Sequence, residues 1–328
     1  MTKNDLLSHI RKPIDDELHD FERLFDDSLS HTDGTLAMVL DYVRQRSGKR
    51  MRPMLTILMA KNFGSVNDTT YYAATALEML HTASLIHDDV VDEADKRRGM
   101  KSVNLAYGNK VAVLAGDYIV STALNIIAKT GSVEMVDVLS LLGSTLSRGE
   151  IKQLSVIGAQ TISEQDYYDV INQKTASLFS TCAALGAMSA KATADEVRAA
   201  RDFGHSIGMI FQIRDDIFDY YDTAEIGKPT GNDMREGKLT LPVIHVLLNQ
   251  GDEEMMNIAM RVKKLVATPD EIARLVAYTK ENSGIEYAQR KMESKGAEAR
   301  NFIFQWVKDP ALKEAFGAYL NYVIMRTL

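Results

Sequence analysis

Apolar residues recur at intervals of three and four along most of the chain, and runs of strict apolar–polar alternation are few. This spacing predicts helices, because 3.6 residues complete a helical turn, whereas alternation would predict strands. The chain has only 6 prolines, which leaves long segments free to be helical. The pattern therefore predicts an all-α fold.

The predicted helices follow one another closely. They cover residues 3–28, 35–46, 50–64, 69–94, 102–108, 110–130, 133–157, 163–190, 194–222 and 238–249, with several more beyond 252. The clearest breaks lie at 47–53 and 223–238, where glycine, proline and asparagine gather. Apolar residues surround the helices at 69–94, 110–130 and 194–222, so we expect these three at the centre of a bundle.

Pairs of adjacent aspartates occur at four places, which provides an internal control. The pairs at 15–16 and 26–27 lie in a charged amphipathic segment, where we expect them to be solvated. The other two belong to the motifs DDVVD at 88–92 and DDIFD at 215–219, each within an apolar run. Residues four apart share a helix face, so Asp88 with Asp92, and Asp215 with Asp219, direct two carboxylates toward one volume.

Such a concentration of negative charge predicts a cation. Like charges four residues apart repel, and near a helix C-terminus the macrodipole disfavours them further. Ligand sets of oxygen atoms suit a hard ion, and Mg²⁺ often bridges one or two carboxylates to substrate phosphates. The two clusters together therefore predict a metal-bound diphosphate between them, although a fortuitous pair of exposed helix ends would explain either cluster alone.

Basic residues suited to a diphosphate adjoin these motifs, because Arg offers a planar fork of donors and Lys a point charge. They are Lys49, Arg50, Arg52, Lys96, Arg97, Arg98, Lys174, Lys228 and Lys238. Each alone would be an ordinary surface base, so their proximity to the motifs is what matters. His81 lies two turns before Asp88 and could face the same cleft, although a buried core histidine fits this spacing nearly as well.

The composition is that of a globular protein with a sizeable core, at 328 residues, 45% hydrophobic and 25% charged. A net charge of −7 argues against binding nucleic acid. The single cysteine, Cys182, excludes an internal disulfide framework, and the N-terminal segment lacks a signal-peptide pattern, so a cytoplasmic location fits best. The most apolar stretch, at 111–128, contains Asp117 and is shorter than the roughly 20 apolar residues that span a bilayer, so we expect no transmembrane helix.

These motifs resemble those of the trans-type polyprenyl diphosphate synthases, which join isopentenyl diphosphate head-to-tail onto an allylic diphosphate. The resemblance covers most of the chain and includes GKRMRP at 48–53, EMLHTASLIHDDVVDEADKRRG at 78–99, GEIKQ at 149–153, KTA at 174–176, FQIRDDIFD at 211–219 and GKPTGND at 227–233. It implies a single domain over residues 1–328, folded as a large helical bundle of the isoprenoid synthase type with a central cavity. It also implies a homodimer.

The same resemblance implies roles for individual residues. Asp88, Asp92, Asp215 and Asp219 correspond to ligands of Mg²⁺, three ions being expected with substrate bound, and Asp89 and Asp216 support them. Arg97, Lys174, Gln212, Lys228 and Lys238 correspond to contacts with the allylic diphosphate, and Lys49, Arg52, His81 and Arg98 to the isopentenyl diphosphate site. Thr175 and Gln153 correspond to residues beside the developing allylic cation. The released diphosphate is thought to take the proton in this family, so no side-chain base is expected.

Product length in the family depends on residues before the first aspartate motif. Short-chain members carry an aromatic residue four or five positions before it, and here those positions are Ser84 and Ala83, both small. From Asp88 back to Ala76 the helix offers about 18 Å of wall at about 1.5 Å per residue. Leu80 and Leu77 also belong to this wall, and Ile127 and Leu139 are candidates for its floor. We therefore expect a long all-trans product, octaprenyl by overall resemblance, made from farnesyl diphosphate for the side chain of a respiratory quinone.

Several alternatives share part of this pattern. A farnesyl or geranylgeranyl diphosphate synthase would carry the same motifs, whereas a non-catalytic subunit of a heteromeric synthase would typically lose aspartates. A terpene cyclase would not need a second diphosphate site, and GKPTGND after the second motif disfavours a head-to-head synthase. A purely structural bundle would leave both carboxylate clusters unexplained. The segment NYVIMRTL carries only Arg326, where some short-chain relatives have a basic cluster that closes the site, and transient membrane contact during product release stays open.

Overall fold

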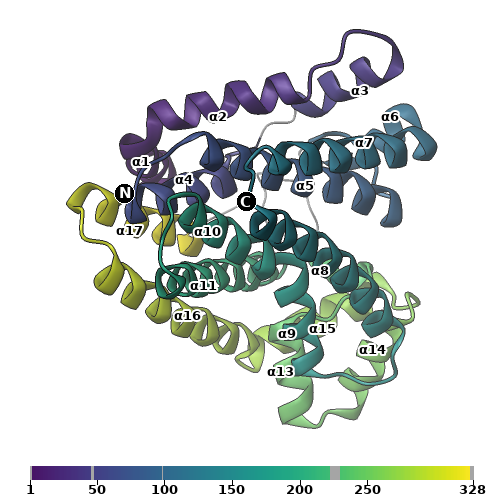
Figure 1. The fold of residues 1–328 in the computed structure, drawn as a ribbon. Helices are drawn as coiled ribbons and strands as arrows, with labels where there is room; N and C mark the ends of the chain where they lie inside the picture. The colour runs from purple at the N-terminus through teal and green to yellow at the C-terminus, as the bar shows by residue number, and fades with distance from the viewer. Residues whose placement is uncertain (1, 46–47, 98, 222–229, 326–328) are drawn as a thin grey trace.

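The computed structural model describes residues 2–45, 48–97, 99–221 and 230–325, and these residues are almost wholly helical (Figure 1). The first half contains α1 (Lys3–Arg11), α2 (Asp15–Ser28), α3 (Gly34–Arg44), α4 (Met51–Phe63), α5 (Asp68–Val91), α6 (Val103–Tyr107), α7 (Asn109–Ala128) and α8 (Val133–Gly158). The second half contains α9 (Glu164–Ile171), α10 (Ser177–Ser189), α11 (Ala194–Phe218), α12 (Asn232–Arg235), α13 (Leu241–Gln250), α14 (Glu253–Lys263), α15 (Pro269–Glu281), α16 (Gly284–Trp306) and α17 (Pro310–Met325). The prediction of an all-α fold is confirmed.

The helix boundaries differ from the predicted ones at three places. A 3₁₀ turn at Lys12–Ile14 contains Pro13 and divides the first predicted helix, since proline lacks the N–H that a continuous helix needs. The predicted helix at 163–190 contains a π-helical segment, η2 (Asn172–Ala176). The predicted helix at 69–94 ends at Val91, and the chain then forms a hairpin of β1 (Lys96–Arg97) and β2 (Met100–Lys101), paired antiparallel.

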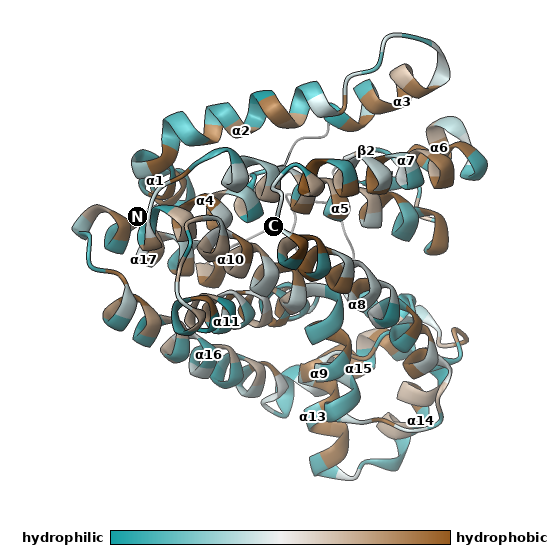
Figure 2. Ribbon diagram, in the orientation of Figure 1, coloured by the Kyte–Doolittle hydropathy of each residue, from teal (hydrophilic) through white to brown (hydrophobic). Residues whose placement is uncertain are grey.

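The interior of the bundle is built on α4, α10 and the part of α11 beyond Phe203, whose side chains are mostly buried. In Figures 1 and 2, α10 and α11 lie near the middle of the bundle. Close approach of these helices requires small residues. A Cβ atom at Gly186 of α10 would lie 2.3 Å from the carbonyl oxygen of Thr56 on α4, and one at Gly204 of α11 would lie 2.4 Å from that of Phe179 on α10. The three helices therefore hold one another at backbone contact distance and form a rigid base for the site.

The prediction of a central position is confirmed for α5 and α11 and is wrong for α7. α7 packs along α5 and α6, yet its apolar side chains Leu114 and Leu124 are 67% and 45% exposed. Apolar residues surround this helix, but neighbours cover only part of its surface. α7 is long and apolar enough to meet a length-and-composition criterion for a membrane span, which core helices also meet, and 39% of its apolar window is buried.

Candidate active site

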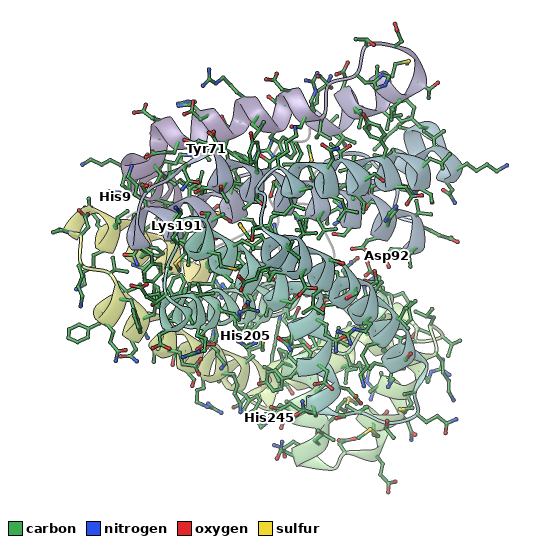
Figure 3. All side chains as sticks on the ribbon, viewed as in Figure 1. His9, Tyr71, Asp92, Lys191, His205 and His245 are labelled. Atoms are coloured by element: carbon green, nitrogen blue, oxygen red, sulfur yellow. The ribbon has the colours of Figure 1, made fainter. Side chains whose placement is uncertain are left out.

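The two aspartate motifs lie at the C-terminal ends of α5 and α11, as their sequence setting predicts. Asp92 follows the last residue of α5, and Figure 3 shows it at that helix end, on the side turned toward the C-terminal half of the chain. Asp219 follows the last residue of α11 in the same way. Both motifs therefore place carboxylates where the helix macrodipole is also negative.

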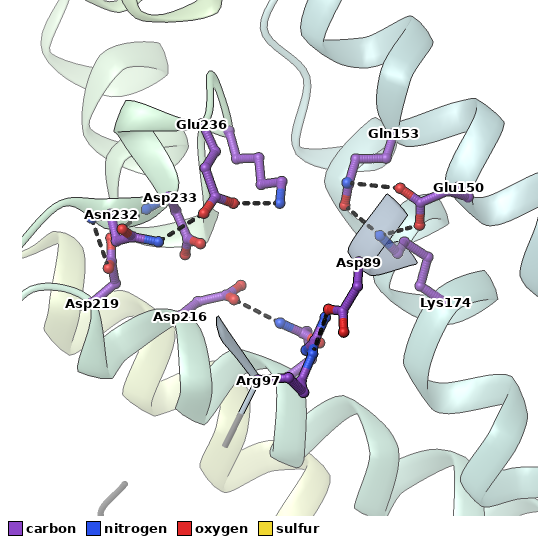
Figure 4. A network of polar contacts seen from close by, with 12 residues as sticks. Asp89, Arg97, Glu150, Gln153, Lys174, Asp216, Asp219, Asn232, Asp233 and Glu236 are labelled. Carbon is purple, nitrogen blue, oxygen red and sulfur yellow. Dashed lines mark hydrogen bonds and ion pairs between the residues drawn. The ribbon is translucent and has the colours of Figure 1, made fainter. Parts of the chain in front are cut away.

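The first cluster joins α5 to α8 and η2 (Figure 4). Lys174 of η2 forms an ion pair with Glu150, and its ammonium also donates a hydrogen bond to Oε1 of Gln153 at 3.1 Å. Burial and, after it, the negative charge of Glu150 raise the pKa of Asp88 to about 6, although the positive charge of Lys174 opposes the rise. Too little positive charge lies near Asp88 to stabilise its ionised form, and a bound cation would supply that charge.

Asp89 lies on a different face of α5 and is buried. Its Oδ1 accepts hydrogen bonds from Arg97 of β1, at 2.8 Å from Nε and 2.6 Å from Nη2. Its backbone carbonyl accepts the N–H of Ala94 at 2.9 Å. Asp89 therefore anchors the hairpin and fixes the position of Arg97 beside the first motif.

The second cluster organises the chain that follows α11. Oδ1 of Asp219 accepts the backbone N–H of Asn232 at 2.9 Å, and Oδ2 accepts that of Asp233 at 3.1 Å, so this side chain caps α12. Burial raises the pKa of Asp233 well above its usual range, and the charges of Asp216 and Asp219 add to the rise while Lys238 opposes it. Burial lowers the pKa of Lys238, but the negative charges of Glu236 and Asp92 raise it overall. Lys238 therefore links the two clusters electrostatically.

Asp216 is the centre of a hydrogen-bonded row. The hydroxyl of Tyr167 donates to Oδ2 of Asp216 at 2.6 Å, and Nε2 of Gln212 donates to Oδ1 at 2.9 Å. The hydroxyl of Thr175 in turn donates to Oε1 of Gln212 at 2.8 Å. Burial raises the pKa of Asp216 to about 7 although both hydrogen bonds lower it, and burial also raises that of Tyr167, which keeps the phenol a donor.

The π-helical segment η2 brings both clusters together. Lys174 reaches Glu150 and Gln153 on α8, while the next residue, Thr175, reaches Gln212 on α11. The wide turn lies against α11 at Gly208, where an added Cβ would stand 2.5 Å from Cα of Ala176. Wide turns of this kind are frequent at functional sites.

Three of the residues predicted for the isopentenyl diphosphate site, Lys49, Arg52 and His81, lie within the described part of the chain. The guanidinium of Arg52 lies 4.8 Å from the ring centroid of Phe179, and Nζ of Lys49 lies 5.5 Å from that of Tyr322. His81 is buried and lines a cavity of about 50 Å³ with Asp89 and Arg97. Asp88 lines a separate groove with Lys174 and Glu150, so a shared cleft for His81 and Asp88 stays a prediction. Arg98, Lys228 and Arg326 lie outside the described residues.

Arg50, in the same basic segment, belongs to the core. Its guanidinium forms an ion pair with Glu78 at 3.0 Å and lies 4.3 Å from the ring centroid of Phe25, and both charged side chains are buried. Its φ of 53° places it in the left-handed region, where side chains other than glycine and asparagine are uncommon. The pair thus fixes the backbone that presents Lys49 and Arg52.

A groove of about 680 Å³ leads away from Asp88 and Lys174 between α5, α7 and α8. Its other lining residues include Leu80, Ser84, Val120, Ser121, Gly143, Leu146 and Ser147. Of the residues predicted to control product length, Ser84 and Leu80 line this groove. Ala83, Ile127 and Leu139 are buried and are not among the lining residues.

Residues that carry the site but were given no role from the sequence are Glu150, Tyr167 and Asp233. Glu150 stands in the quoted GEIKQ motif, three residues before Gln153, and this spacing would place both on one face of a helix. Asp233 ends the GKPTGND motif. Tyr167 has no sequence signal beyond its place seven residues before Lys174, two turns earlier on the same predicted helix.

The donor set suits a hard cation held jointly with a substrate. Among the described residues, no three His, Cys, Asp or Glu side chains lie close enough to hold an ion by themselves. Asp88 and Asp92 nevertheless offer oxygen donors alone, and burial of Asp88 without sufficient positive charge favours a cation there. An ion that also takes oxygen ligands from a diphosphate would satisfy this arrangement, as Mg²⁺ commonly does.

Comparison with known proteins places these features in a family. The polyprenyl synthetase family model matches residues 33–279. The chain is 32% identical over 306 residues to octaprenyl diphosphate synthase of Haemophilus influenzae, covering 92% of this chain and 93% of that protein. The crystal structure of geranylgeranyl pyrophosphate synthase from Bacteroides thetaiotaomicron is 44% identical, with a TM-score of 0.86 and coverage of 98% and 100% of the two chains.

A third relative was solved with ligands. The polyprenyl synthase of Caulobacter crescentus, complexed with calcium and isoprenyl diphosphate, is 27% identical, with a TM-score of 0.90 and 98% of both chains covered. The family match and these similarities show the family of the chain, and the two aspartate clusters agree with it. The chain belongs to the polyprenyl synthetase family of prenyltransferases and has its all-α isoprenoid synthase fold.

Proposed function

We propose that this prenyltransferase condenses isopentenyl diphosphate head-to-tail onto an allylic diphosphate, with farnesyl diphosphate as primer, and makes a long-chain all-trans polyprenyl diphosphate of about eight isoprene units. The observation that carries the long-chain assignment is the groove between α5, α7 and α8. The small residues Ser84, Ser121 and Gly143 line this groove beyond Asp88. An aromatic side chain at position 84 would close it, and none is present.

The metal in this proposal is Mg²⁺, three ions being bound with the substrate. Asp88, Asp92 and Asp215 would hold them together with the diphosphate oxygens, and Asp219, whose oxygens already accept two backbone N–H groups, supports the loop beside them. When bound, the ions neutralise the negative charge that develops on the departing diphosphate. Arg97, Lys174 and Lys238 provide the remaining positive charge from three separate elements, with Lys228 a further candidate.

Three of the bases assigned to the allylic diphosphate have an anionic partner in the protein without substrate. Arg97 is paired with Asp89, Lys174 with Glu150 and Lys238 with Glu236 at 2.7 Å. These pairs preorganise the bases, which need not be desolvated anew when the diphosphate arrives. Thr175 and Gln153 would face the allylic carbon as its bond to oxygen breaks, and the released diphosphate would take the proton from the new carbon–carbon unit.

Isopentenyl diphosphate would bind to Lys49 and Arg52, with His81 and Arg98 as further candidates. The guanidinium of Arg52 lies over the ring of Phe179, and its fork of N–H donors suits Arg to phosphate binding. We take residues 1–328 as one synthase domain acting in the cytoplasm as a homodimer. The exposed apolar side chains of α7, Leu114 and Leu124, support the dimer, since a second copy would remove them from water.

A shorter product is the second candidate. The geranylgeranyl pyrophosphate synthase from Bacteroides thetaiotaomicron shares 44% of its residues with this chain, more than the octaprenyl diphosphate synthase named above. The two candidates differ only in where the groove ends. Leu80 lies 3.8 Å from the position of a Cβ added at Gly143, so these two residues narrow the groove from opposite walls.

The test is to incubate the purified protein with Mg²⁺, farnesyl diphosphate and labelled isopentenyl diphosphate, and to resolve the dephosphorylated products by chain length. A dominant product near eight units supports the long-chain assignment. A product that stops at four units replaces it with the geranylgeranyl assignment. Absence of any Mg²⁺-dependent product refutes the proposed reaction and favours a non-catalytic subunit.

A further inference from the structure

Four side chains from three elements form an unbroken row of hydrogen bonds through the site. Tyr167 of α9 donates to Asp216 of α11, Asp216 accepts from Gln212, and Gln212 accepts from Thr175 of η2. Tyr167 and Asp216 are only 6% and 4% exposed, so water has little access to replace either partner. Both also line a cavity of about 230 Å³ shared with Lys174, Thr175 and Gln212.

The direction of each hydrogen bond in the row follows from donor chemistry. In its ionised form the carboxylate of Asp216 accepts and does not donate, so it faces the amide nitrogen of Gln212, which lies 2.9 Å from its Oδ1. The amide oxygen of Gln212 then faces Thr175, whose hydroxyl must donate to it. As a result, the lone pairs of the Thr175 oxygen are turned away from Gln212, and the one proton of that hydroxyl is already committed.

We propose that Tyr167 is a positioning residue for prenyl transfer. By holding Oδ2 of Asp216, it fixes the carboxylate that orients the amide of Gln212, and through that amide it directs the lone pairs of Thr175 toward the electron-poor allylic carbon. This inference rests on the proposed function, because the place of Thr175 beside that carbon belongs to it. In this role Tyr167 acts through Asp216 and not by contact with the reacting atoms.

Removal of the Tyr167 hydroxyl should therefore affect the chemical step more than substrate binding. In Tyr167→Phe the carboxylate of Asp216 loses its phenolic donor, and the orientation of Gln212 and of Thr175 is no longer enforced. We expect kcat for single condensation to fall about tenfold, while KM for both diphosphates and the Mg²⁺ concentration for half-maximal rate stay within about twofold. A tyrosine that only supported packing would not separate kcat from KM in this way.

A double-mutant cycle with Thr175 tests the proposed route. In a Thr175→Val background, which lacks the hydroxyl, Tyr167→Phe should lower kcat no further than about twofold. In a Thr175→Ser background, which keeps the hydroxyl, the tenfold loss should persist. Equal losses in the Val and Ser backgrounds would overturn the proposal, as would an unchanged kcat in the single variant. If Tyr167→Phe does not fold, Asp216→Asn breaks the row at its next member and must show the same coupling.

Tyr168→Phe is the matched control. Tyr168 is the next residue on α9, its ring centroid is 5.4 Å from that of Tyr167, and burial raises its pKa too, but its charged neighbour is Glu164 rather than Asp216. The kcat of the Tyr168→Phe variant should stay within about twofold of that of the parent protein in every background. An inactive wild-type protein would refute the proposed function, whereas an active wild type with an unaffected Tyr167→Phe would refute this inference alone.

Discussion

Replacing Asp88 by asparagine should make the metal-free protein more stable while it abolishes prenyl transfer. Burial raises the pKa of Asp88 from its usual 3.8 to about 6, so at neutral pH the fold bears the cost of an ionised, poorly compensated carboxylate. A difference of just over 2 pH units, at about 1.36 kcal/mol for each, corresponds to about 3 kcal/mol. Asparagine has nearly the same shape and carries no charge, so it should relieve most of that cost.

The gain must depend on pH in a defined direction. Below pH 3.8, Asp88 is protonated in both the folded and the unfolded protein, and the variant should have no advantage. Between pH 3.8 and about 6 the folded protein holds a proton that the unfolded chain has lost, so wild-type stability declines relative to the variant as pH rises through this interval. Above that pH the difference should be constant at its full value.

The measurement is chemical denaturation of both proteins in chelator between pH 4 and 8, supported by thermal unfolding. With an unfolding entropy of about 2.1 cal/mol/K per residue, 3 kcal/mol corresponds to a rise of roughly 4–5 °C in Tm for a chain of this size. Asp27→Asn, at an exposed position on α2, is the control and should change stability by no more than about 0.5 kcal/mol. Equal stability of Asp88→Asn and wild type at pH 8 would refute the reasoning.

Three further changes test other parts of the molecule. With dimethylallyl diphosphate as primer, Ser84→Phe should stop products at about three isoprene units, because position 84 is one helical turn, about 6 Å, from Asp88 on the wall of the groove. Product analysis should show no shortening in Ser84→Ala. Arg50→Ala should cost about 3–5 kcal/mol in urea denaturation, since it leaves Glu78 buried without its partner, and a loss below 1 kcal/mol would contradict this account of the pair. Leu114→Glu, at an exposed apolar position on α7, should dissociate the proposed homodimer in light scattering, and an unchanged mass would place the interface elsewhere.

The sequence predicted the class of fold and the two aspartate clusters because both depend on local spacing. Helix period and the four-residue repeat of aspartates act within one element, and both were visible without the structure. The error over α7 has another origin, since apolar residues on all sides of a helix do not reveal how many neighbours cover it. For His81, helical spacing alone did not decide between a cleft shared with Asp88 and a buried core position, and the structure places it among buried residues beside Asp89 and Arg97.

Contacts between distant segments could not be predicted in this way. The hydrogen bond from Tyr167 to Asp216 spans 49 residues, and it depends on how α9 packs against α11. The cap that Asp219 provides for α12 likewise requires the chain to turn back after α11. Motifs therefore identified the aspartates, while the roles of the residues that hold them in position became visible only in the folded chain.

The wide turn at Asn172–Ala176 also has a consequence for how related sequences are aligned. Because the turn holds more residues than an α-helical one, the helical phase of α10 is offset from that of α9, by about 100° for each extra residue. A deletion at this point, such as that of Gln173, would preserve every neighbouring residue type yet rotate one helix relative to the other. Insertions and deletions between Tyr168 and Ser177 should therefore be much rarer among active relatives than substitutions at the same positions.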